Sequence, residues 1–304
     1  MTYSARAYAK VNLHLEVLNK RSDFYHNIFS FNASLDIFDR LTFKRLIAFN
    51  KKSGDISVDI HPEGGEYPDT IISIRNEDNL ITKAIIAYLN RIGRSASVEI
   101  AVEKNIPAGA GLGGGSSDAA AALRIINSYF ADKNEGLTDN EIGQIGAKIG
   151  ADVPYCLIGG YAFCEGIGDV VESLNGKLDY WVLVANSGIS VNTSEAYSVL
   201  GRTILPVFSE KEILNRKKLF YEGLAGGSID SFRHILRNDF EHSVFARYPE
   251  LKNLKDLIIK FSPEYVTMTG SGSSIIGLFT DRRQAEIAGY ELGKKAKVLI
   301  TKFT

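Results

Sequence analysis

The stretch "PAGAGLGGGSSDAAAAL", residues 107–123, places five glycines within seven positions. Glycine loses more conformational freedom on folding than any other residue, so such a cluster needs a structural reason. Alternating apolar residues predict a strand over residues 97–104, and helical spacing of apolar residues from Ala119 to Phe130 predicts a helix after the loop. A glycine loop between a strand and a helix start is typical of an anion site, because backbone N–H groups can converge on a phosphate. A flexible linker or a plain tight turn is the alternative.

Two well-known phosphate loops do not fit this stretch. The Walker A pattern fails because Gly115 stands where lysine is required after Gly109 and Gly114. The dinucleotide pattern is met by Gly109, Gly111 and Gly114, but a glycine-dense loop meets it by chance. Two predicted helices follow, with no strand that ends in an acidic residue, so a hydride-transfer enzyme is disfavoured.

Composition limits the partners that this chain can have. Lys plus Arg is 35 and Asp plus Glu is 36, a net charge of -1, which predicts neither nucleic-acid nor anionic-membrane binding. Cys156 and Cys164 lack the neighbours of a metal site. We see neither an apolar signal segment nor a run of ~18 apolar residues. The sequence therefore predicts a cytoplasmic protein.

Periodicity outlines the remaining elements. Apolar residues at every second position of residues 7–17 predict a strand with one face in a core, and residues 29–43 read as further strand broken by turn residues. The other expected strands span residues 55–60, 181–186, 265–270, 274–279 and 297–303, and the expected helices span residues 77–93, 138–149, 230–261 and 282–293. Residues 202–228 are left unassigned. The length favours two domains, which we place at residues 1–165 and 166–304.

The loop "PAGAGLGGGSSDAA" resembles the phosphate loop of the GHMP kinase superfamily, which includes galactokinase, homoserine kinase, mevalonate kinase and phosphomevalonate kinase. Within it, the chain is most similar to the 4-diphosphocytidyl-2-C-methyl-D-erythritol kinase family. Four more segments match in order: "AKVNLHLEVLNKRSDFYHNI", "NEDNLI", "GADVPYCLIGGYAFCEGIGD" and "MTGSGSS". The resemblance thus runs from about Ala9 to Phe279. It implies an α+β fold, with an N-terminal α/β (S5-like) ATP-binding domain and a C-terminal ferredoxin-like substrate-binding domain.

The resemblance implies an ATP-dependent kinase of the non-mevalonate isoprenoid precursor pathway. The reaction would convert the 2-hydroxyl of 4-diphosphocytidyl-2-C-methyl-D-erythritol to the 2-phosphate and release ADP. Asp152 would be the catalytic base, and Lys10, beside it, would stabilise charge on the transferring group. Taken alone, Asp152 would be a turn residue and Lys10 a solvated lysine.

The resemblance also implies the binding residues. Those for ATP are Lys104, Pro107, Ala108, Gly109, Ala110, Gly111, Leu112, Gly113, Gly114, Gly115, Ser116 and Ser117. Those for the substrate are Asn12, Tyr25, His26, Thr193, Tyr197, Gly270, Ser271 and Gly272. Tyr25 would stack on the cytosine, His26 would hydrogen-bond its edge, and Tyr197 would close an aromatic sandwich. No carboxylates are spaced for a dedicated metal site, so Mg²⁺ is expected to arrive with ATP.

Two alternatives remain open. The chain could be another GHMP-type kinase, acting on mevalonate or homoserine, although Tyr25 and His26 favour cytidine. It could also be a non-catalytic nucleotide-binding module, although such a module needs neither Lys10 nor Asp152. We expect a small-molecule substrate and a monomer or weak homodimer.

Two residues depart from the family pattern. Phe24 stands where the family usually has glycine, so it must adopt a strained or altered turn if that position needs a positive φ. Asp118 stands where asparagine is common, a change that should be harmless at a helix start.

Overall fold

Two long N-terminal strands contribute to both of the compact units into which the chain divides. The computed structural model describes residues 3–49, 56–204 and 209–304. Unit 1 comprises Met1–Ala9, Ile37–Ala108 and Gly113–Ile158, and unit 2 comprises Lys10–Asp36, Gly109–Leu112 and Gly159–Thr304. The division therefore differs from the single boundary expected after residue 165. The reason is that β1 (Tyr3–Lys20), β2 (His26–Phe49) and the glycine loop each pass from one unit to the other.

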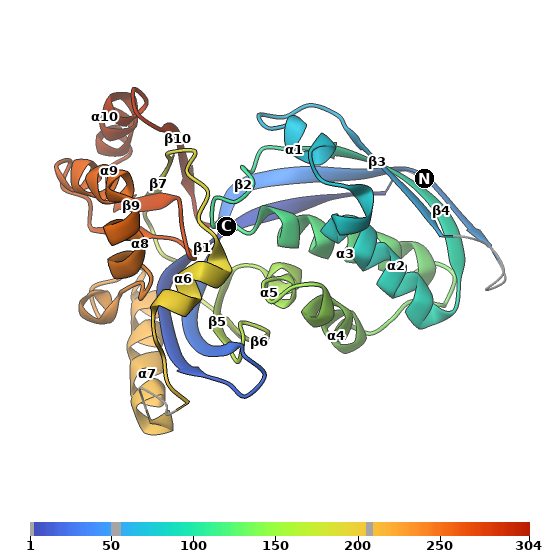
Figure 1. The fold of residues 1–304 in the computed structure, drawn as a ribbon, viewed down its shortest axis with the longest axis horizontal. Helices are drawn as coiled ribbons and strands as arrows, with labels where there is room; N and C mark the ends of the chain where they lie inside the picture. Colours follow the sequence, from blue (N-terminus) through green and yellow to red (C-terminus); the bar gives the residue numbers. More distant parts are fainter. Residues whose placement is uncertain (1–2, 50–55, 205–208) are drawn as a thin grey trace. The chain divides into compact units, whose positions relative to one another are not determined.

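Unit 1 packs helices on a small sheet (Figure 1). The sheet pairs β3 (Ser57–Pro62) in parallel with β4 (Ser95–Glu103), and β4 antiparallel with the second part of β2. The helices are α1 (Asp69–Ile72), the 3₁₀ turn η1 (Asn76–Asp78), α2 (Leu80–Ile92), α3 (Gly114–Ala131), α4 (Asp139–Ile149) and α5 (Val153–Ile158). Helix α3 leads directly out of the glycine loop and packs against α2 and α5.

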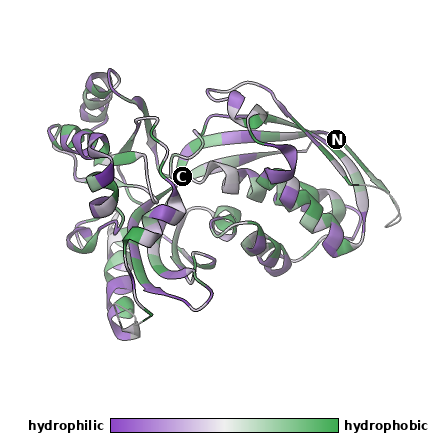
Figure 2. Cartoon of the chain, in the orientation of Figure 1, coloured by the Kyte–Doolittle hydropathy of each residue, from purple (hydrophilic) through white to green (hydrophobic). Residues whose placement is uncertain are grey.

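The helix signals in the sequence of unit 1 are confirmed. Asn79 caps α2 by accepting from the backbone N–H of Ile81, and Gly93 ends it in a left-handed conformation, with φ 67°. Thr138 and Glu141 form a capping box at the start of α4, where the helix over residues 138–149 was expected to begin. Figure 2 shows hydrophobic and hydrophilic residues alternating along these helices, as expected for helices with one buried face.

Unit 2 contains the predicted ferredoxin-like arrangement. Its four-stranded antiparallel sheet has the order β10-β7-β9-β8, from β7 (Trp181–Asn186), β8 (Tyr265–Met268), β9 (Ile275–Phe279) and β10 (Lys297–Lys302). Helices α8 (Glu241–Arg247), α9 (Pro249–Ile259) and α10 (Arg282–Leu292) lie beside it (Figure 1). The unit also holds β5 (Tyr161–Glu165), β6 (Val170–Leu174), α6 (Thr193–Val199), α7 (Glu210–Gly226) and the 3₁₀ turn η2 (Arg233–Ile235).

The unassigned segment contains the longest helix of unit 2. Ser209 and Glu212 form a capping box at the start of α7, a signal that was present in the sequence. The buried ring of Phe220 anchors this helix, because it lies 4.8 Å from the ring of Phe31 and 4.5 Å from that of Phe232. Helix α7 therefore contributes Phe220 to the core of unit 2.

Three predictions about secondary structure need correction. Residues 29–43 are not broken by turns, since β2 is one strand with a single register shift between Phe43 and Arg45. Residues 230–261 are not one helix but η2, α8 and α9, separated before Pro249. The strand expected at residues 55–60 is shifted toward the C-terminus, since β3 spans Ser57–Pro62. Asp55 lies outside the described residues.

The polar face of β1 is a fourth correction, because it is buried rather than solvated. Lys10 is only 4% exposed, and Asn12, His14 and Glu16 are buried as well. These groups have polar partners: the Glu16 carboxylate binds Arg216 and, at 2.6 Å, Arg237. Alternation therefore located the strand correctly but could not reveal that both of its faces are covered.

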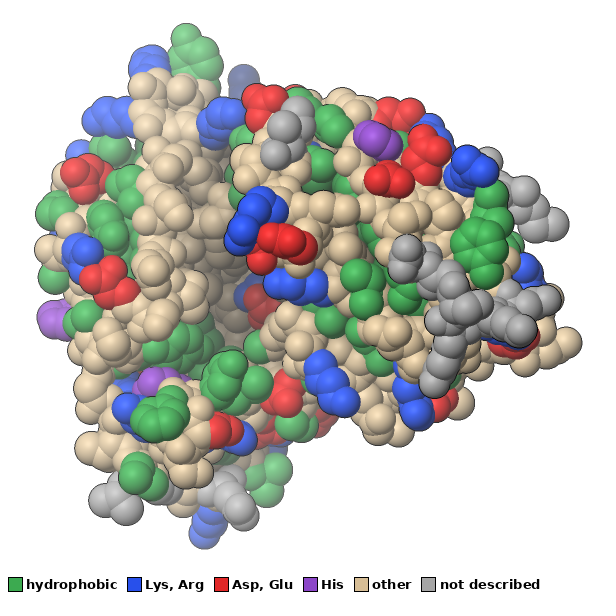
Figure 3. All heavy atoms as spheres, turned by 45° about the vertical axis from the view of Figure 1, so that its right-hand side comes forward, with side chains coloured by type: hydrophobic (Ala, Val, Ile, Leu, Met, Phe, Trp, Pro, Cys, Tyr) green, Lys and Arg blue, Asp and Glu red, His purple; other side chains and the backbone are tan. Residues whose placement is uncertain are grey.

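None of the helices that the structure describes combines the length and the apolar character that a bilayer crossing requires. On the face that Figure 3 presents, basic and acidic side chains lie interspersed.

Candidate active site

The glycine loop adopts a backbone that few other residues could follow. Gly109, Gly111 and Gly113 have φ values of 65°, 76° and 69°. At Gly111 a side chain is also excluded by space, because a Cβ would collide with the carbonyl oxygen of Thr269 and approach that of Gly272 to 3.0 Å. The glycine density thus has a local cause: left-handed backbone at alternate residues and close contact with a second loop.

The loop ends at a helix start that no side chain caps. Gly113 is the N-cap of α3, and neither a capping side chain nor an acidic residue occupies its first turn. The first N–H groups of such a helix lack intrahelical partners and carry the positive end of the helix dipole. Ser117 is buried, and its hydroxyl donates to the carbonyl oxygen of Gly114 at 2.9 Å, whereas Ser116 is half-buried. The arrangement can bind an anion, with Ser116 as the more accessible hydroxyl.

A buried charge cluster holds both ends of this loop within unit 1. The Lys104 ammonium donates to Asp118 of α3 at 2.7 Å and to Asp39 of β2. Asp39 also accepts the backbone N–H groups of Asn105, at 2.5 Å, and Ile106, at 2.8 Å. These contacts therefore connect the end of β4, which leads into the loop, with α3, which follows the loop.

The titration of this cluster follows from its burial. Burial raises the pKa of the Asp118 carboxyl to about 8, although Lys104 opposes the shift. Burial alone would lower the pKa of Lys104, but the charges of Asp118 and Asp39 outweigh it and raise that pKa. Since the Lys104 ammonium already has two carboxylate partners, its contact with ATP stays a prediction.

Asp152 directly precedes α5 and is half-buried in unit 1. Its carbonyl accepts the N–H of Cys156 at 3.0 Å, and Arg124 of α3 binds the carbonyl oxygens of Cys156 and Leu157. A Cβ at Gly150, two residues before Asp152, would lie 3.8 Å from the Ser116 hydroxyl. The structure thus brings the segment of Asp152 to the start of α3.

Lys10 and Asn12 belong to a buried polar network in unit 2. The Lys10 ammonium donates to the Asn12 side-chain oxygen at 2.9 Å. The Asn12 amide nitrogen in turn donates to Ser30 at 2.8 Å and to Asn32 at 2.7 Å, so these partners fix its orientation.

The middle of the glycine loop is held by the second glycine turn. Within unit 2 the backbone N–H of Lys10 donates to Leu112 at 2.9 Å, and that of Ser274 donates to Ala110 at 3.2 Å. The Thr269 hydroxyl accepts the Asn12 N–H at 2.9 Å and lies 3.3 Å from the carbonyl oxygen of Gly111. The segment with Gly270, Ser271 and Gly272 therefore supports the loop, and its contact with substrate stays a prediction.

The residues expected to bind cytidine are partly assembled in unit 2. His26 stacks on Tyr197 with ring centres 5.0 Å apart, and the Phe240 ring meets Tyr197 edge-on at 4.8 Å. Tyr25 is 61% exposed. The Thr193 hydroxyl lies 2.9 Å from that of Ser271. In this arrangement His26 covers one face of Tyr197. The expected stacking of cytosine between Tyr25 and Tyr197 stays a prediction.

The environment of His26 affects its charge. Burial, followed by the nearby charges of Lys20 and Arg202, lowers the pKa of His26 below its usual value of 6.5. The ring is therefore neutral at pH 7, with one nitrogen free to accept a hydrogen bond.

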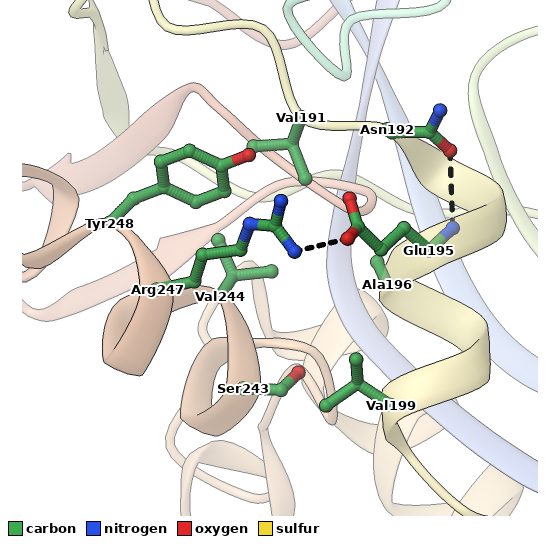
Figure 4. Close-up of a pocket in the computed structure, with 9 residues that line it drawn as sticks. All are labelled: Val191, Asn192, Glu195, Ala196, Val199, Ser243, Val244, Arg247 and Tyr248. Carbon is green, nitrogen blue, oxygen red and sulfur yellow. Dashed lines mark hydrogen bonds and ion pairs between the residues drawn. The ribbon is translucent and has the colours of Figure 1, made fainter.

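A small cavity lies between α6 and α8 (Figure 4). Its volume of about 20 Å³ is room for about one water molecule. The ion pair between Glu195 and Arg247 crosses it, and Asn192 caps α6 by accepting the N–H of Glu195 at 3.1 Å. These contacts fix the helix that carries Thr193 and Tyr197.

A larger cavity in unit 1 was not expected from the sequence. It measures about 210 Å³ and is lined by Asp59, Ile60, His61, Ile71, Ile74, Asn76 and Asn79. It lies near the loop, because Leu80, next to Asn79, would be 3.6 Å from a Cβ at Gly115. In the sequence, the motif "NEDNLI" could have indicated this cavity, because it contains Asn76 and Asn79, which line it.

Among the described residues, no three His, Cys, Asp or Glu side chains gather to hold a metal ion. Asp118, the acidic residue nearest the loop in sequence, is engaged with Lys104.

Comparison with known proteins agrees with this geometry. Residues 79–160 match the GHMP kinases N terminal domain, and residues 219–298 match the GHMP kinases C terminal domain. The chain is 36% identical over 286 residues to a 4-diphosphocytidyl-2-C-methyl-D-erythritol kinase of Thermodesulfovibrio yellowstonii, covering 94% of this chain and 92% of that protein.

Solved structures give the same result for the fold. A 4-(cytidine 5'-diphospho)-2C-methyl-D-erythritol kinase matches with a TM-score of 0.71 and 29% identity, over 99% of this chain and 98% of that one. A homoserine kinase from Cytophaga hutchinsonii matches with a TM-score of 0.65 and 16% identity, over 99% of this chain and 95% of that one, a likeness of fold alone. The predicted fold class is confirmed.

Proposed function

The chain belongs to the 4-diphosphocytidyl-2-C-methyl-D-erythritol kinase family of GHMP kinases, and on that premise we propose that it transfers the γ-phosphoryl group of ATP to the 2-hydroxyl of 4-diphosphocytidyl-2-C-methyl-D-erythritol. The products are the 2-phosphate and ADP. The observation that carries the proposal is the glycine loop that opens into the uncapped start of α3, with the segment of Asp152 beside it. An alcohol kinase needs these parts: a phosphate cradle and a base.

The glycine loop binds the polyphosphate of ATP through its backbone. The first N–H groups of α3 and the Ser116 hydroxyl donate to phosphate oxygens, and the helix dipole favours the negative charge. The 210 Å³ cavity beside Asn79 is large enough for the purine ring, and it lies in the same unit as the start of α3. Mg²⁺ carried by ATP would neutralise part of the phosphate charge, and the start of α3 with Ser116 would hold the phosphates that carry it.

Asp152 acts as the general base. It accepts the proton of the substrate's 2-hydroxyl as that oxygen forms a bond with the γ-phosphorus. The bond between the γ-phosphorus and the bridging oxygen of ADP breaks, and ADP leaves with the electron pair. The Lys10 ammonium stabilises negative charge on the transferring group, and Asn12 holds the Lys10 side chain in place.

His26 reads the cytosine edge. Its lowered pKa keeps the imidazole neutral, so one ring nitrogen accepts a hydrogen bond from the amino group of cytosine. Tyr25 offers an exposed ring for stacking. A doubly protonated imidazole or a purely apolar residue at position 26 could not accept this hydrogen bond.

Asp152→Asn tests the base. We expect kcat to fall about 10²–10⁴-fold while the Kd for ATP changes less than about twofold, because the amide keeps the shape but cannot accept the proton. Asp139→Asn, an exposed acid at the start of α4, is the matched control and should retain full activity. An unchanged kcat in Asp152→Asn would remove the base assignment.

The substrate is tested by offering the cytidyl compound, mevalonate and homoserine side by side. The cytidyl compound should be phosphorylated with the highest kcat/KM. Turnover of mevalonate or homoserine without turnover of the cytidyl compound would show that the substrate is wrong although the kinase chemistry is right. A monomer or weak homodimer remains our expectation.

A further inference from the structure

The hairpin turn between β1 and β2 places a bulky residue where the backbone favours glycine. The backbone N–H of Phe24 donates to the carbonyl oxygen of Arg21 at 3.3 Å, and the Arg21 N–H donates to that of Tyr25 at 2.8 Å. These bonds close a three-residue loop whose last residue, Phe24, has a φ of 69°. The strained turn expected from the sequence is thus confirmed, since only glycine enters this region without steric cost.

The rest of unit 2 does not offset this cost. Phe24 is 81% exposed, so burial of its ring adds little to stability. Among the described residues, Asn134 and Ser262 also have positive φ, of 59° and 53°, but both are small and polar. A bulky, exposed side chain kept in a strained conformation points to a role outside the folded core.

The turn that carries Phe24 is braced by its own side chains. Arg21 forms an ion pair with Asp23 at 2.9 Å, and Asp23 accepts the backbone N–H of Tyr25 at 3.2 Å. Arg21 also donates to the side-chain oxygen of Asn27 at 3.2 Å. The ring is therefore presented from an ordered backbone, so that little freedom remains to be lost when it contacts a ligand.

Phe24 has a second exposed aromatic residue next to it in sequence and a cation near its ring. The exposed Tyr25 follows Phe24 in the chain, and the Lys20 ammonium lies 5.6 Å from the centre of the Phe24 ring. Flat aromatic faces next to positive charge suit a nucleoside diphosphate, which offers a planar base and an anionic diphosphate. An uncharged or purely aliphatic alcohol would gain little from this combination.

We infer that Phe24 is a specificity-determining residue, which adds a second aromatic contact beside Tyr25 to the cytidine part of the substrate. The inference rests on the proposed function and deepens it. Glycine, which the family usually has here, would relax the backbone but supply no ring. This chain keeps the ring at the expense of stability, and the expected gain is affinity for the nucleoside.

Substitutions at Phe24 separate the ring from the backbone strain. Phe24→Gly removes both, so the midpoint of thermal unfolding should rise by roughly 2 °C. Its KM for the cytidyl compound should rise about 5- to 30-fold, with kcat within about twofold of wild type. Phe24→Ala removes only the ring, and should show the same KM without the thermal gain. Phe24→Tyr keeps a ring, and should keep the wild-type KM.

Ser262→Gly is the matched control, because it relieves a positive φ in the same unit at a distance in sequence from the hairpin. Its unfolding midpoint should rise while its KM stays unchanged. Calorimetry with CDP measures the same recognition without turnover, and the Kd of the Phe24 variants for CDP should follow the order of their KM values.

The inference is wrong if Phe24→Gly and Phe24→Ala keep both KM and the CDP Kd within about twofold of wild type. It is also wrong if Phe24→Gly changes the mass of the protein measured by sedimentation but leaves the KM unchanged. The Phe24 ring would then contribute to a contact between copies of the chain. A wild-type protein that phosphorylates no cytidyl compound overturns the proposed function instead. The CDP measurement then still decides whether Phe24 contacts the nucleoside.

Discussion

The glycine loop and the β1–β2 hairpin both contain left-handed backbone, and they accommodate it in opposite ways. In the loop the positive φ values fall on Gly109, Gly111 and Gly113, whereas in the hairpin the positive φ falls on Phe24. Absence of side chains lets the amides of the loop approach a phosphate. Presence of a side chain on the hairpin exposes a ring. The proposed contacts differ accordingly: the backbone of the loop would meet a phosphate, and the side chain of Phe24 would meet a base.

The two turns also differ in what holds them. The hairpin is braced within itself by Arg21 and Asp23. The loop is held by residues far away in sequence, with Thr269 at its middle and the cluster of Lys104, Asp39 and Asp118 at its ends. The geometry of the loop should therefore respond to changes in several elements, while that of the hairpin should respond only to changes within the turn.

Gly111→Ala should have the largest effect. Alanine would strain the φ of 76° and push against the carbonyl oxygen of Thr269, so we expect the free energy of unfolding to fall by about 3 kcal/mol. Displacement of the loop should also lower kcat/KM by about 10²-fold. Urea unfolding and steady-state kinetics measure the two effects.

The matched control is Gly143→Ala, inside α4, where a Cβ meets open space. That variant should be stabilised by up to ~1 kcal/mol. Equal stability of Gly111→Ala and wild type would mean that the second glycine turn does not brace the loop.

Gly115→Ala should show whether glycine at this position is needed for ligand binding or for the stability of the fold. Gly115 lies in the first turn of α3, and the nearest neighbour of a Cβ there is Leu80 at an ordinary 3.6 Å. Stability should hold or rise by up to ~1 kcal/mol. The methyl group would nevertheless stand among the phosphate-binding amides, so the KM for ATP should rise about 10-fold. An unchanged KM would exclude this helix start as the cradle.

Local patterns predicted most of the elements but not the burial of the first strand. Capping residues such as Thr138 and Glu141 fixed the bounds of α4, because caps depend on neighbours in sequence. The alternation of apolar residues predicted the strand β1 and suggested that its polar face is exposed to solvent. A period of two cannot distinguish water from a buried network, and the partners of Asn12 on β2 come from 18 and 20 residues away.

The sequence signals for the proposed site are strongest where its motifs are contiguous. The glycine loop between a strand and a helix start indicated a phosphate loop, whereas the roles of Lys10 and Asp152 came from resemblance to a family and stay predictions. Asp39 was missed because its partner Lys104 lies 65 residues away, and nothing in its local sequence marks it. Asn238, which donates to the carbonyl oxygens of Met268 and Gly270, was missed for the same reason.

Asp118→Asn should change the pH dependence of stability. Burial raises the pKa of Asp118 from 3.8 to about 8, so the folded chain holds this proton more tightly than the unfolded chain does. The stability that Asp118 contributes is therefore complete below pH 3.8 and is lost as the pH rises toward 8. Asparagine stays neutral throughout. Between pH 5 and 8 the wild-type free energy of unfolding should fall more steeply with pH than that of the variant.

Denaturant unfolding at several pH values measures this difference, with Asp256→Asn, an exposed partner of Lys252, as the control whose slope matches wild type. The result bears on how the two turns are held. The ion pair of Arg21 and Asp23 is exposed, and its partner lowers the pKa of Asp23, so the hairpin brace keeps its charges across this range. Parallel slopes for Asp118→Asn and wild type would mean that Asp118 is ionised beside Lys104, and that fixed charges hold the ends of the loop as they hold the hairpin.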